Sequence, residues 1–240
     1  MMVKIQAAVL ALAACLAPVS ALAQSCPAPL SDARRLMLVT AENMTTREAT
    51  AQLFERATPG DPWRPIALAE PALVGRNGIA WSYFFRTFSR KGEPLKVEGD
   101  KRAPAGIYRI GKSFGILPSG RAGYTQLTEG TTCIDDPQSP AYNTIASRAK
   151  VGWKVHGENM WRVPEYRSGL FVDYPTNARA RAGSCIFIHV RLPEKNSTGG
   201  CVALPQARVE AVQDFAQAGA VLAILPRAAL GRFEGCLPVN

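Results

Sequence analysis

The sequence predicts a mainly β domain with a few peripheral helices. Its 20 glycines and 18 prolines are scattered along the chain, which favours many turns and short strands over long helices. Short apolar runs rich in β-branched and aromatic residues recur between these turns, as is typical of strands. Helical periodicity is clear in only one stretch, which follows Pro205.

The first half of the chain offers four candidate strands. Residues 35–41 and 50–56 are largely apolar runs joined by a polar turn. Residues 63–74 contain a third candidate, interrupted by Pro71, which cannot donate a ladder hydrogen bond. The aromatic stretch 81–88 is interpreted either as a strand or as an irregular wall of a substrate site.

The second half of the chain contains further strands and one weak helix. Residues 107–110 alternate like a half-buried strand. Residues 142–155 are weakly helical, and residues 168–172 predict a short strand. The runs 186–188 and 220–225 are apolar and rich in β-branched side chains, which predicts two more strands.

One helix is predicted directly after residue 204. Pro205 suits the first turn of a helix, where its missing N–H is not needed. Val209, Val212 and Phe215 then fall on one helical face, and Gly219 provides a stop signal.

Residues 1–23 are interpreted as a secretory signal peptide. Lys4 supplies a short positive region, and the apolar run 5–16 is too short to span a bilayer. Ala21-Leu22-Ala23 fits an A-x-A cleavage site, so Gln24 is predicted as the mature N-terminus.

Residues 24–240 are interpreted as one domain, exported to the periplasm. Their length suits a single core, and we find no internal repeat or low-complexity linker. Lipoprotein anchoring at Cys15 is a rival interpretation of the leader. It is disfavoured because the apolar stretch continues past that cysteine.

The chain is basic, with a formal net charge of +9. Basic stretches include residues 86–91 and the run that carries Arg179 and Arg181. A solvated positive surface is the simpler explanation. The alternative is attraction to an anionic envelope polymer or membrane surface. Nucleic acid is disfavoured as a partner, because the chain is predicted to be exported and has no recognition motif.

The cysteine count suggests a free thiol. Of the six cysteines, Cys15 leaves with the signal peptide, and an odd number remains in an oxidising compartment. If Cys201 is free, the other four allow three pairings. The pairing we favour among these three is a guess that ties the termini together: Cys26–Cys236 and Cys133–Cys185.

A histidine and a cysteine lie close together in the stretch 184–204. His189 ends the strand predicted at 186–188, and Cys201 follows two glycines at a loop-to-helix junction. An imidazole can take the thiol proton, and a helix N-terminus favours the thiolate. Gly199 and Gly200 let backbone N–H groups approach a reacting carbonyl and hold an oxyanion. The simpler alternative is a buried structural cysteine and a core histidine.

These residues resemble the active-site signature of the L,D-transpeptidase catalytic domain, the YkuD-like family. I-H-V, a short loop and S-T-G-G-C match its His, variable loop and Ser/Thr-x-Gly-Cys pattern. The blocks 75–81, 96–115 and 133–143 extend the resemblance over nearly the whole mature chain. Two positions depart from the pattern: Gly199, where many members have His, and Ala203, where many have Arg or Asn.

The resemblance implies a β-sandwich-like catalytic fold and a cysteine transpeptidase that cross-links peptidoglycan stem peptides. Cys201 would attack the donor carbonyl and form a thioacyl-enzyme, and His189 would be the proton carrier. The resemblance also implies that the backbone carbonyl of Val190 orients the imidazole. It implies no metal or organic cofactor, and it implies covalent reaction with carbapenems.

Two alternatives to the transpeptidase remain open, so there are three candidate functions in all. Water instead of an amine could resolve the thioester, which would make the protein a stem-peptide hydrolase (carboxypeptidase or endopeptidase). The third candidate is a non-catalytic cell-wall-binding protein, which predicts an unreactive or disulfide-bonded Cys201.

Four other residues are candidate contacts for the substrate, and two of them, Tyr174 and Asp136, also have a structural alternative. Ser197 and Thr198 precede the nucleophile in the signature. Tyr174 could line a groove, although aromatic residues more commonly pack in a core. Asp136 could bind a cationic amine, although a turn cap before Pro137 is the simpler role. Metal catalysis is disfavoured, because the two histidines, His156 and His189, show no clustered ligand pattern.

Overall fold

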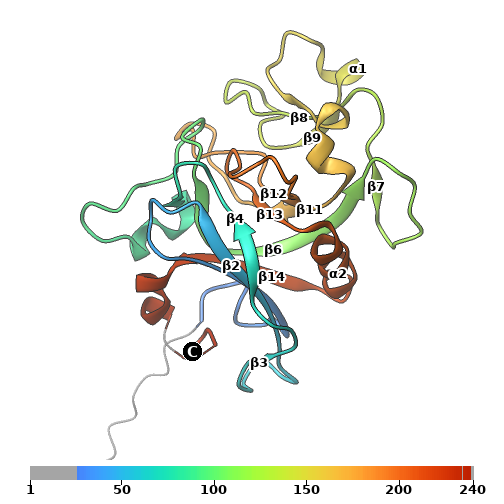
Figure 1. The fold of residues 1–240 in the computed structure, drawn as a ribbon. Helices are drawn as coiled ribbons and strands as arrows, with labels where there is room; N and C mark the ends of the chain where they lie inside the picture. Colours follow the sequence, from blue (N-terminus) through green and yellow to red (C-terminus); the bar gives the residue numbers. More distant parts are fainter. Residues whose placement is uncertain (1–25, 234, 239–240) are drawn as a thin grey trace, which may run out of the picture.

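The computed structural model describes residues 26–233 and 235–238, so the predicted signal peptide and Cys15 lie outside the described residues. The fold is rich in β-structure with few helices, as the sequence predicts (Figure 1). One sheet of eleven strands forms the body of the molecule. Among the described residues, every helix is too short or too polar to cross a membrane.

The main sheet follows one path and then closes on itself, because its first strand also pairs with β2. Strands β5 (Ile79–Trp81) and β7 (Thr125–Gln126) pair with β6 off this path. The path runs in this order: β1 (Arg35–Ala41), β14 (Ala220–Pro226), β6 (Ala103–Gly115), β11 (Ser168–Asp173), β12 (Phe187–Val190), β13 (Val202–Leu204), β4 (Glu70–Leu73), β2 (Glu48–Glu55) and β3 (Arg64–Pro65).

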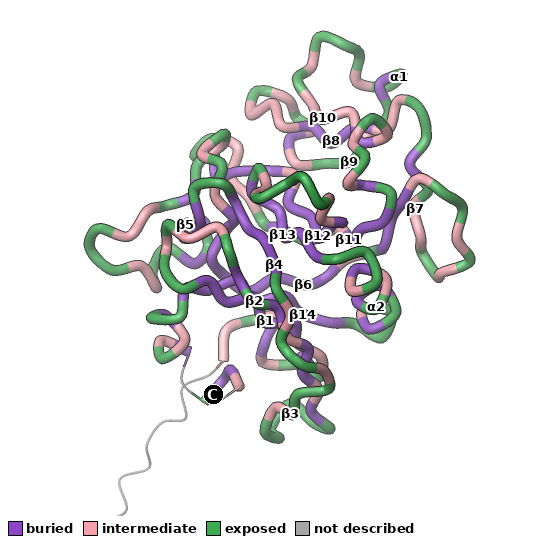
Figure 2. The backbone as a smooth tube through the Cα atoms, viewed as in Figure 1, coloured by how far each residue is buried: buried purple, intermediate pink, exposed green. Residues whose placement is uncertain are grey.

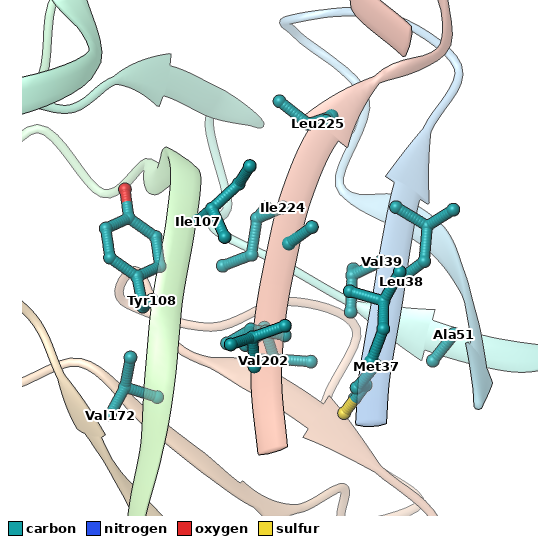
Figure 3. Close-up of a cluster of buried hydrophobic side chains, with 14 of the residues drawn as sticks. Met37, Leu38, Val39, Ala51, Ile107, Tyr108, Val172, Val202, Ile224 and Leu225 are labelled. Carbon is teal, nitrogen blue, oxygen red and sulfur yellow. The ribbon is translucent and has the colours of Figure 1, made fainter. Parts of the chain in front are cut away.

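Two long and largely apolar strands, β1 and β14, lie side by side in the main sheet. All of β14 and all but the first residue of β1 are buried, and the two strands pair in parallel, with Leu36 opposite Val221. Continuous apolar runs are typical of strands covered on both faces. Figure 2 shows the buried residues concentrated along these strands, and Figure 3 shows Val39, Ile107 and Ile224 within one cluster of packed side chains.

A second, three-stranded sheet forms a lobe at one end of the molecule (Figure 1). Its strand order is β10 (Glu158–Asn159), β8 (Thr131–Cys133) and β9 (Ile145–Ser147). Three short helices accompany it: α1 (Arg148–Val151), η2 (Met160–Arg162) and η3 (Pro164–Arg167). The disulfide Cys133–Cys185 joins this lobe to the segment that leads into β12.

Helix α2 (Gln206–Ala216) lies where the sequence predicts a helix, but Pro205 is its N-cap and not a residue of its first turn. Val209, Val212 and Phe215 are its buried apolar face. The helix ends at Ala216, slightly before Gly219, which has a positive φ of 85° in the turn that leads into β14.

The guessed disulfide pairing is confirmed. Cys26 bonds to Cys236 and Cys133 bonds to Cys185, which leaves Cys201 as the free cysteine among the described residues. The first bond ties the two ends of the described chain together.

The stretch 81–88 is a strand only at its first residue. Trp81 ends β5, and Tyr83–Phe88 forms the 3-10 helix η1. A 3-10 helix brings residues three apart onto one side. Phe85 and Phe88 therefore both reach Phe233 in the closing 3-10 helix η4 (Arg227–Phe233), with ring centroids 6.5 and 4.5 Å away.

Two other predicted elements are shorter than expected. Within 142–155 only Arg148–Val151 is helical, because residues 145–147 pair with β8 instead. Within 63–74 the chain forms two short strands, β3 and β4, and Pro71 lies inside β4.

Candidate active site

His189 lies in β12 with its orientation fixed by a neighbouring backbone group. The imidazole is buried, and its Nδ1 lies 3.0 Å from the carbonyl oxygen of Val190. A carbonyl can only accept, so Nδ1 carries the proton and Nε2 has the free lone pair. Burial lowers the pKa of His189, which favours this neutral form. The histidine is therefore poised to accept a proton at Nε2.

Cys201 lies immediately before β13, the strand that pairs in parallel with β12. The register places His189 opposite Ala203, two residues after the cysteine. The Cys201 Sγ accepts a hydrogen bond from the Phe187 N–H at 3.3 Å and lies 3.5 Å from the Cys185 carbonyl oxygen. Neighbouring strands thus carry the two residues of the predicted pair into one region.

The Cys201 thiol is neutral in this arrangement. Burial is the main cause that raises its pKa to about 12, and the charge of Glu158 raises it further. The hydrogen bond from the Phe187 N–H and the hydroxyl of Tyr166 act in the opposite direction. An uncharged thiol and a neutral imidazole therefore form the resting pair.

The expected helix N-terminus beside Cys201 is not there. Residues 202–204 form strand β13, and α2 starts only at Gln206. The prediction of a loop-to-helix junction was wrong, because Val202, Ala203 and Leu204 extend the ladder beside β12 before the chain turns into the helix. The effect of a helix terminus falls off within one turn.

Cys201 and His189 line one cavity of about 430 Å³. Ser197, Thr198, Gly199 and Gly200 line the same cavity, as the sequence predicts for the residues before the nucleophile. Its acidic lining residues are Glu98, Asp135, Glu158 and Glu165. Its basic lining residues are Arg76, Lys96, Lys101 and Lys195.

Thr198 holds the turn that carries Cys201. Its hydroxyl donates to the Cys201 carbonyl oxygen at 2.7 Å and accepts from the Gly200 N–H at 3.1 Å. Gly200 has a φ of 149°, which side chains disfavour, and a Cβ there would lie 3.0 Å from the Arg102 carbonyl oxygen. No neighbouring atom lies within 4 Å of a Cβ built at Gly199, so that position is open.

Two predicted substrate contacts lie away from the cavity. Tyr174 is buried, its hydroxyl donates to the Ala182 carbonyl at 2.6 Å, and its ring packs on Tyr108. Asp136 accepts from the Gln138 N–H at 3.0 Å, which makes it a turn cap. Both therefore follow their structural alternatives, and the proposed substrate roles are not supported by their positions.

The second histidine is a surface residue. The side chain of His156 is 80% exposed and contacts the carboxylate of Asp135, which lines the cavity. Among the described residues, no group of three or more His, Cys, Asp or Glu side chains is arranged to hold a metal ion.

Tyr166 and Glu158 are among the cavity residues that the sequence did not single out. The ring of Tyr166 meets the His189 imidazole edge to face, with centroids 5.4 Å apart. The Tyr166 hydroxyl donates to Glu158 Oε2 at 2.7 Å. Neither residue belongs to a motif, since Tyr166 comes from η3 and Glu158 from β10 of the small lobe. Only the folded chain brings them beside the Cys/His pair.

Comparison of the chain with models of known protein families, and with curated proteins, finds no match.

Proposed function

We propose that this protein is an exported cysteine L,D-transpeptidase that cross-links peptidoglycan stem peptides. The observation that carries the proposal is the pairing of a free thiol with a neutral, backbone-oriented imidazole in one cavity. General-base activation of a cysteine needs such a base within hydrogen-bond reach of the thiol. In the resting structure the Sγ instead contacts the Phe187 N–H and the Cys185 carbonyl oxygen, so the sulfur must turn toward His189 for activation. The sandwich-like catalytic fold that the sequence resemblance implies belongs to the same proposal.

The first half-reaction forms an acyl-enzyme. His189 Nε2 takes the proton of Cys201 as the sulfur attacks the donor carbonyl at an L-configured centre. The C–N bond then breaks, the imidazolium returns its proton to the departing D-amino acid, and a thioester remains on Cys201. Because both groups are neutral at rest, proton transfer accompanies attack instead of preceding it.

The second half-reaction releases the product. An amine of a second stem peptide attacks the thioester, the C–S bond breaks, and His189 relays the amine proton to the sulfur. The charged residues of the cavity support a stem-peptide ligand, because such peptides carry both carboxylates and amines. Four acidic and four basic side chains face the space in which donor and acceptor would meet.

The oxyanion would be held by amides of the turn 199–201. The Gly200 N–H is engaged by Thr198 in the resting structure, so Thr198 must yield it or another amide of the turn must serve. Cysteine acylation also requires that the Sγ leave the Cys185 carbonyl and turn toward the substrate.

Intact-mass spectrometry of the non-reduced protein, with and without a carbapenem, tests the proposal. We expect one covalent adduct on the wild type and none on Cys201→Ala. The adduct would establish an activated thiol, and cross-linked products from purified muropeptides would then establish transpeptidation.

The outcomes separate the alternatives. Trimmed muropeptides without cross-links would identify the hydrolase. An unmodified wild type that also leaves muropeptides unchanged, yet binds cell walls as well as Cys201→Ala does, would identify the wall-binding protein. Export is tested on the same mass spectrum, since signal cleavage predicts a chain that begins at Gln24.

A further inference from the structure

Glu158 is an unusual neighbour for a nucleophilic cysteine. It lines the same cavity as Cys201 and comes from β10 in the small lobe. Its Oε2 accepts the Tyr166 hydroxyl at 2.7 Å, so the carboxylate is held in place. A negative charge near a thiol disfavours the thiolate.

Tyr166 connects this carboxylate to the catalytic pair. Its ring packs edge to face on His189, and on Phe187, whose N–H donates to the Cys201 sulfur. The phenol is buried, and its hydroxyl lies near enough to affect the pKa of Cys201. One side chain therefore touches the base, the segment beside the sulfur and Glu158.

Most of the other charged residues around the cavity are engaged by partners of their own. Lys96 is held by Asp100, with Nζ 2.5 Å from Oδ1, and Lys195 lies 3.7 Å from Glu165. Asp135 contacts His156, and Glu98 accepts from Tyr142 and Ser184. Arg76 and Lys101 are the remaining basic residues of the lining. Burial, followed by the charges of Asp135 and Glu165, raises the pKa of Glu158, while Tyr166 and Lys101 lower it.

We propose that Glu158, positioned by the Tyr166 hydroxyl, keeps the Cys201 thiol protonated at rest, and that a protonated amine docking against Glu158 releases it. The inference rests on the proposed function for the source of the amine. An ammonium beside the carboxylate cancels its field at the sulfur, so the proton passes more easily from Cys201 to His189. Activation is then coupled to occupancy of the cavity, and the empty site stays unreactive.

The test is the rate of alkylation of Cys201 by iodoacetamide as a function of pH, in the intact non-reduced protein. We expect Glu158→Gln, which can still accept the Tyr166 hydroxyl, to move the midpoint of the profile to lower pH and to raise the rate at pH 8 several-fold. The midpoint of Glu158→Asp, which keeps the carboxylate, should lie closer to that of the wild type than the midpoint of Glu158→Gln does. Glu194→Gln is the matched control, because it removes the same charge from the exposed 191–196 loop, and its profile should overlay the wild type.

The amine half of the proposal uses n-propylammonium chloride as the probe, with sodium chloride at equal ionic strength as the reference. The probe should speed alkylation of the wild type and leave Glu158→Gln unaffected. A wild-type rate that does not respond, or an equal response in both proteins, overturns docking at Glu158. A Glu158→Gln profile that overlays the wild type overturns the whole inference.

A folding defect is recognised separately. If Glu158→Gln loses its circular-dichroism spectrum, Glu158→Asp decides the point through the amine probe: n-propylammonium that speeds alkylation of a folded Glu158→Asp as it does the wild type supports the inference, and a folded Glu158→Asp that does not respond overturns it. The readout involves only the thiol. A protein that shows these responses but makes no cross-links would therefore reject the proposed function alone.

Discussion

One hydrogen bond determines which nitrogen of the His189 imidazole carries the proton. Nδ1 of His189 donates to the carbonyl of Val190, so the basic nitrogen of the ring is Nε2. Because the acceptor belongs to the backbone of β12, no substitution of a side chain can remove it. This explains how the site can orient its base without an acidic third residue.

Glu93 provides a prediction at the residue scale. Its carboxylate accepts from Arg232 at 2.5 and 2.6 Å and from Trp81 at 2.7 Å. The hydrogen bonds from Arg232 lower the pKa of Glu93 from its ordinary value of 4.5 to about 2. We expect Glu93→Gln to lower the free energy of unfolding by about 2 kcal/mol at pH 7, as for charged hydrogen bonds.

The contribution of Glu93 to the free energy of unfolding is expected to decrease as the pH falls. The pKa of Glu93 is depressed on folding, so its stabilisation is complete above pH 4.5 and disappears as pH falls toward 2. Urea unfolding across this range should give a shallower acid limb for Glu93→Gln than for the wild type. Parallel curves would contradict the assignment.

Cys201 and His189 were predicted from the sequence because a short motif carries them. Tyr166 and Glu158 were not, because their proximity depends on the small lobe folding against β12, which no local pattern encodes. Tyr174 and Asp136 were named as candidate substrate contacts for a related reason. Aromatic and acidic residues have common structural roles, and sequence alone does not reveal which role the surroundings impose.

Helix α2 is fastened to the sheet by a buried amide. Gln213 Nε2 lies 3.2 Å from the Phe114 carbonyl oxygen on β6 and 3.0 Å from the Gly169 carbonyl oxygen on β11. These two strands show an irregular register between Leu170 and Val172. The glutamine therefore satisfies backbone acceptors close to a place where the ladder is disturbed.

Gln213→Leu should destabilise the protein by about 1–3 kcal/mol, because it leaves buried carbonyl oxygens without a donor. Thermal unfolding followed by circular dichroism measures the effect. Gln217→Leu is the matched control at the exposed end of the same helix, and it should leave the melting temperature nearly unchanged. Equal shifts in both variants would show that the amide contributes nothing specific.

The predicted strands agree with the structure where an apolar run in the sequence is also buried in the sheet. Strand β1 has the predicted bounds, and β14 extends only one residue beyond its prediction, since long apolar runs suit the centre of a sheet. The stretch 81–88 was ambiguous because its aromatics serve packing on Phe233 and not a ladder. The sequence also lacked any signal for closure of the sheet, which depends on the pairing of β1 with β2 and of β13 with β4.

The two disulfides constrain different parts of the molecule. Cys26–Cys236 closes a separation of 210 residues and ties the chain ends together, whereas Cys133–Cys185 closes 52 residues beside the candidate site. Chain-entropy estimates give about 5 and about 4 kcal/mol respectively. The smaller contribution belongs to the bond that holds the Glu158 lobe near Cys201.

The two double variants should therefore separate stability from site integrity. Cys26→Ser with Cys236→Ser should lower the melting temperature more and keep the alkylation profile of Cys201. Cys133→Ser with Cys185→Ser should lower it less and alter that profile, because the lobe loses its covalent attachment. Calorimetry measures the two melting temperatures. Alkylation of Cys201, at one temperature below the unfolding of both variants, measures the state of the site. Identical profiles in the two variants would show that the inner bond does not maintain the site.

The parallel pairing of β12 with β13 has a consequence for how such a site can diversify. The ladder fixes the relative placement of His189 and Cys201, while residues 191–197 connect the two strands and contribute Lys195 and Ser197 to the cavity lining. Under the proposed function, the reacting pair and this part of the lining thus belong to separate stretches of the chain. Loop exchange across 191–197 would then offer a route to new acyl acceptors in directed evolution, with His189 and Cys201 left in register.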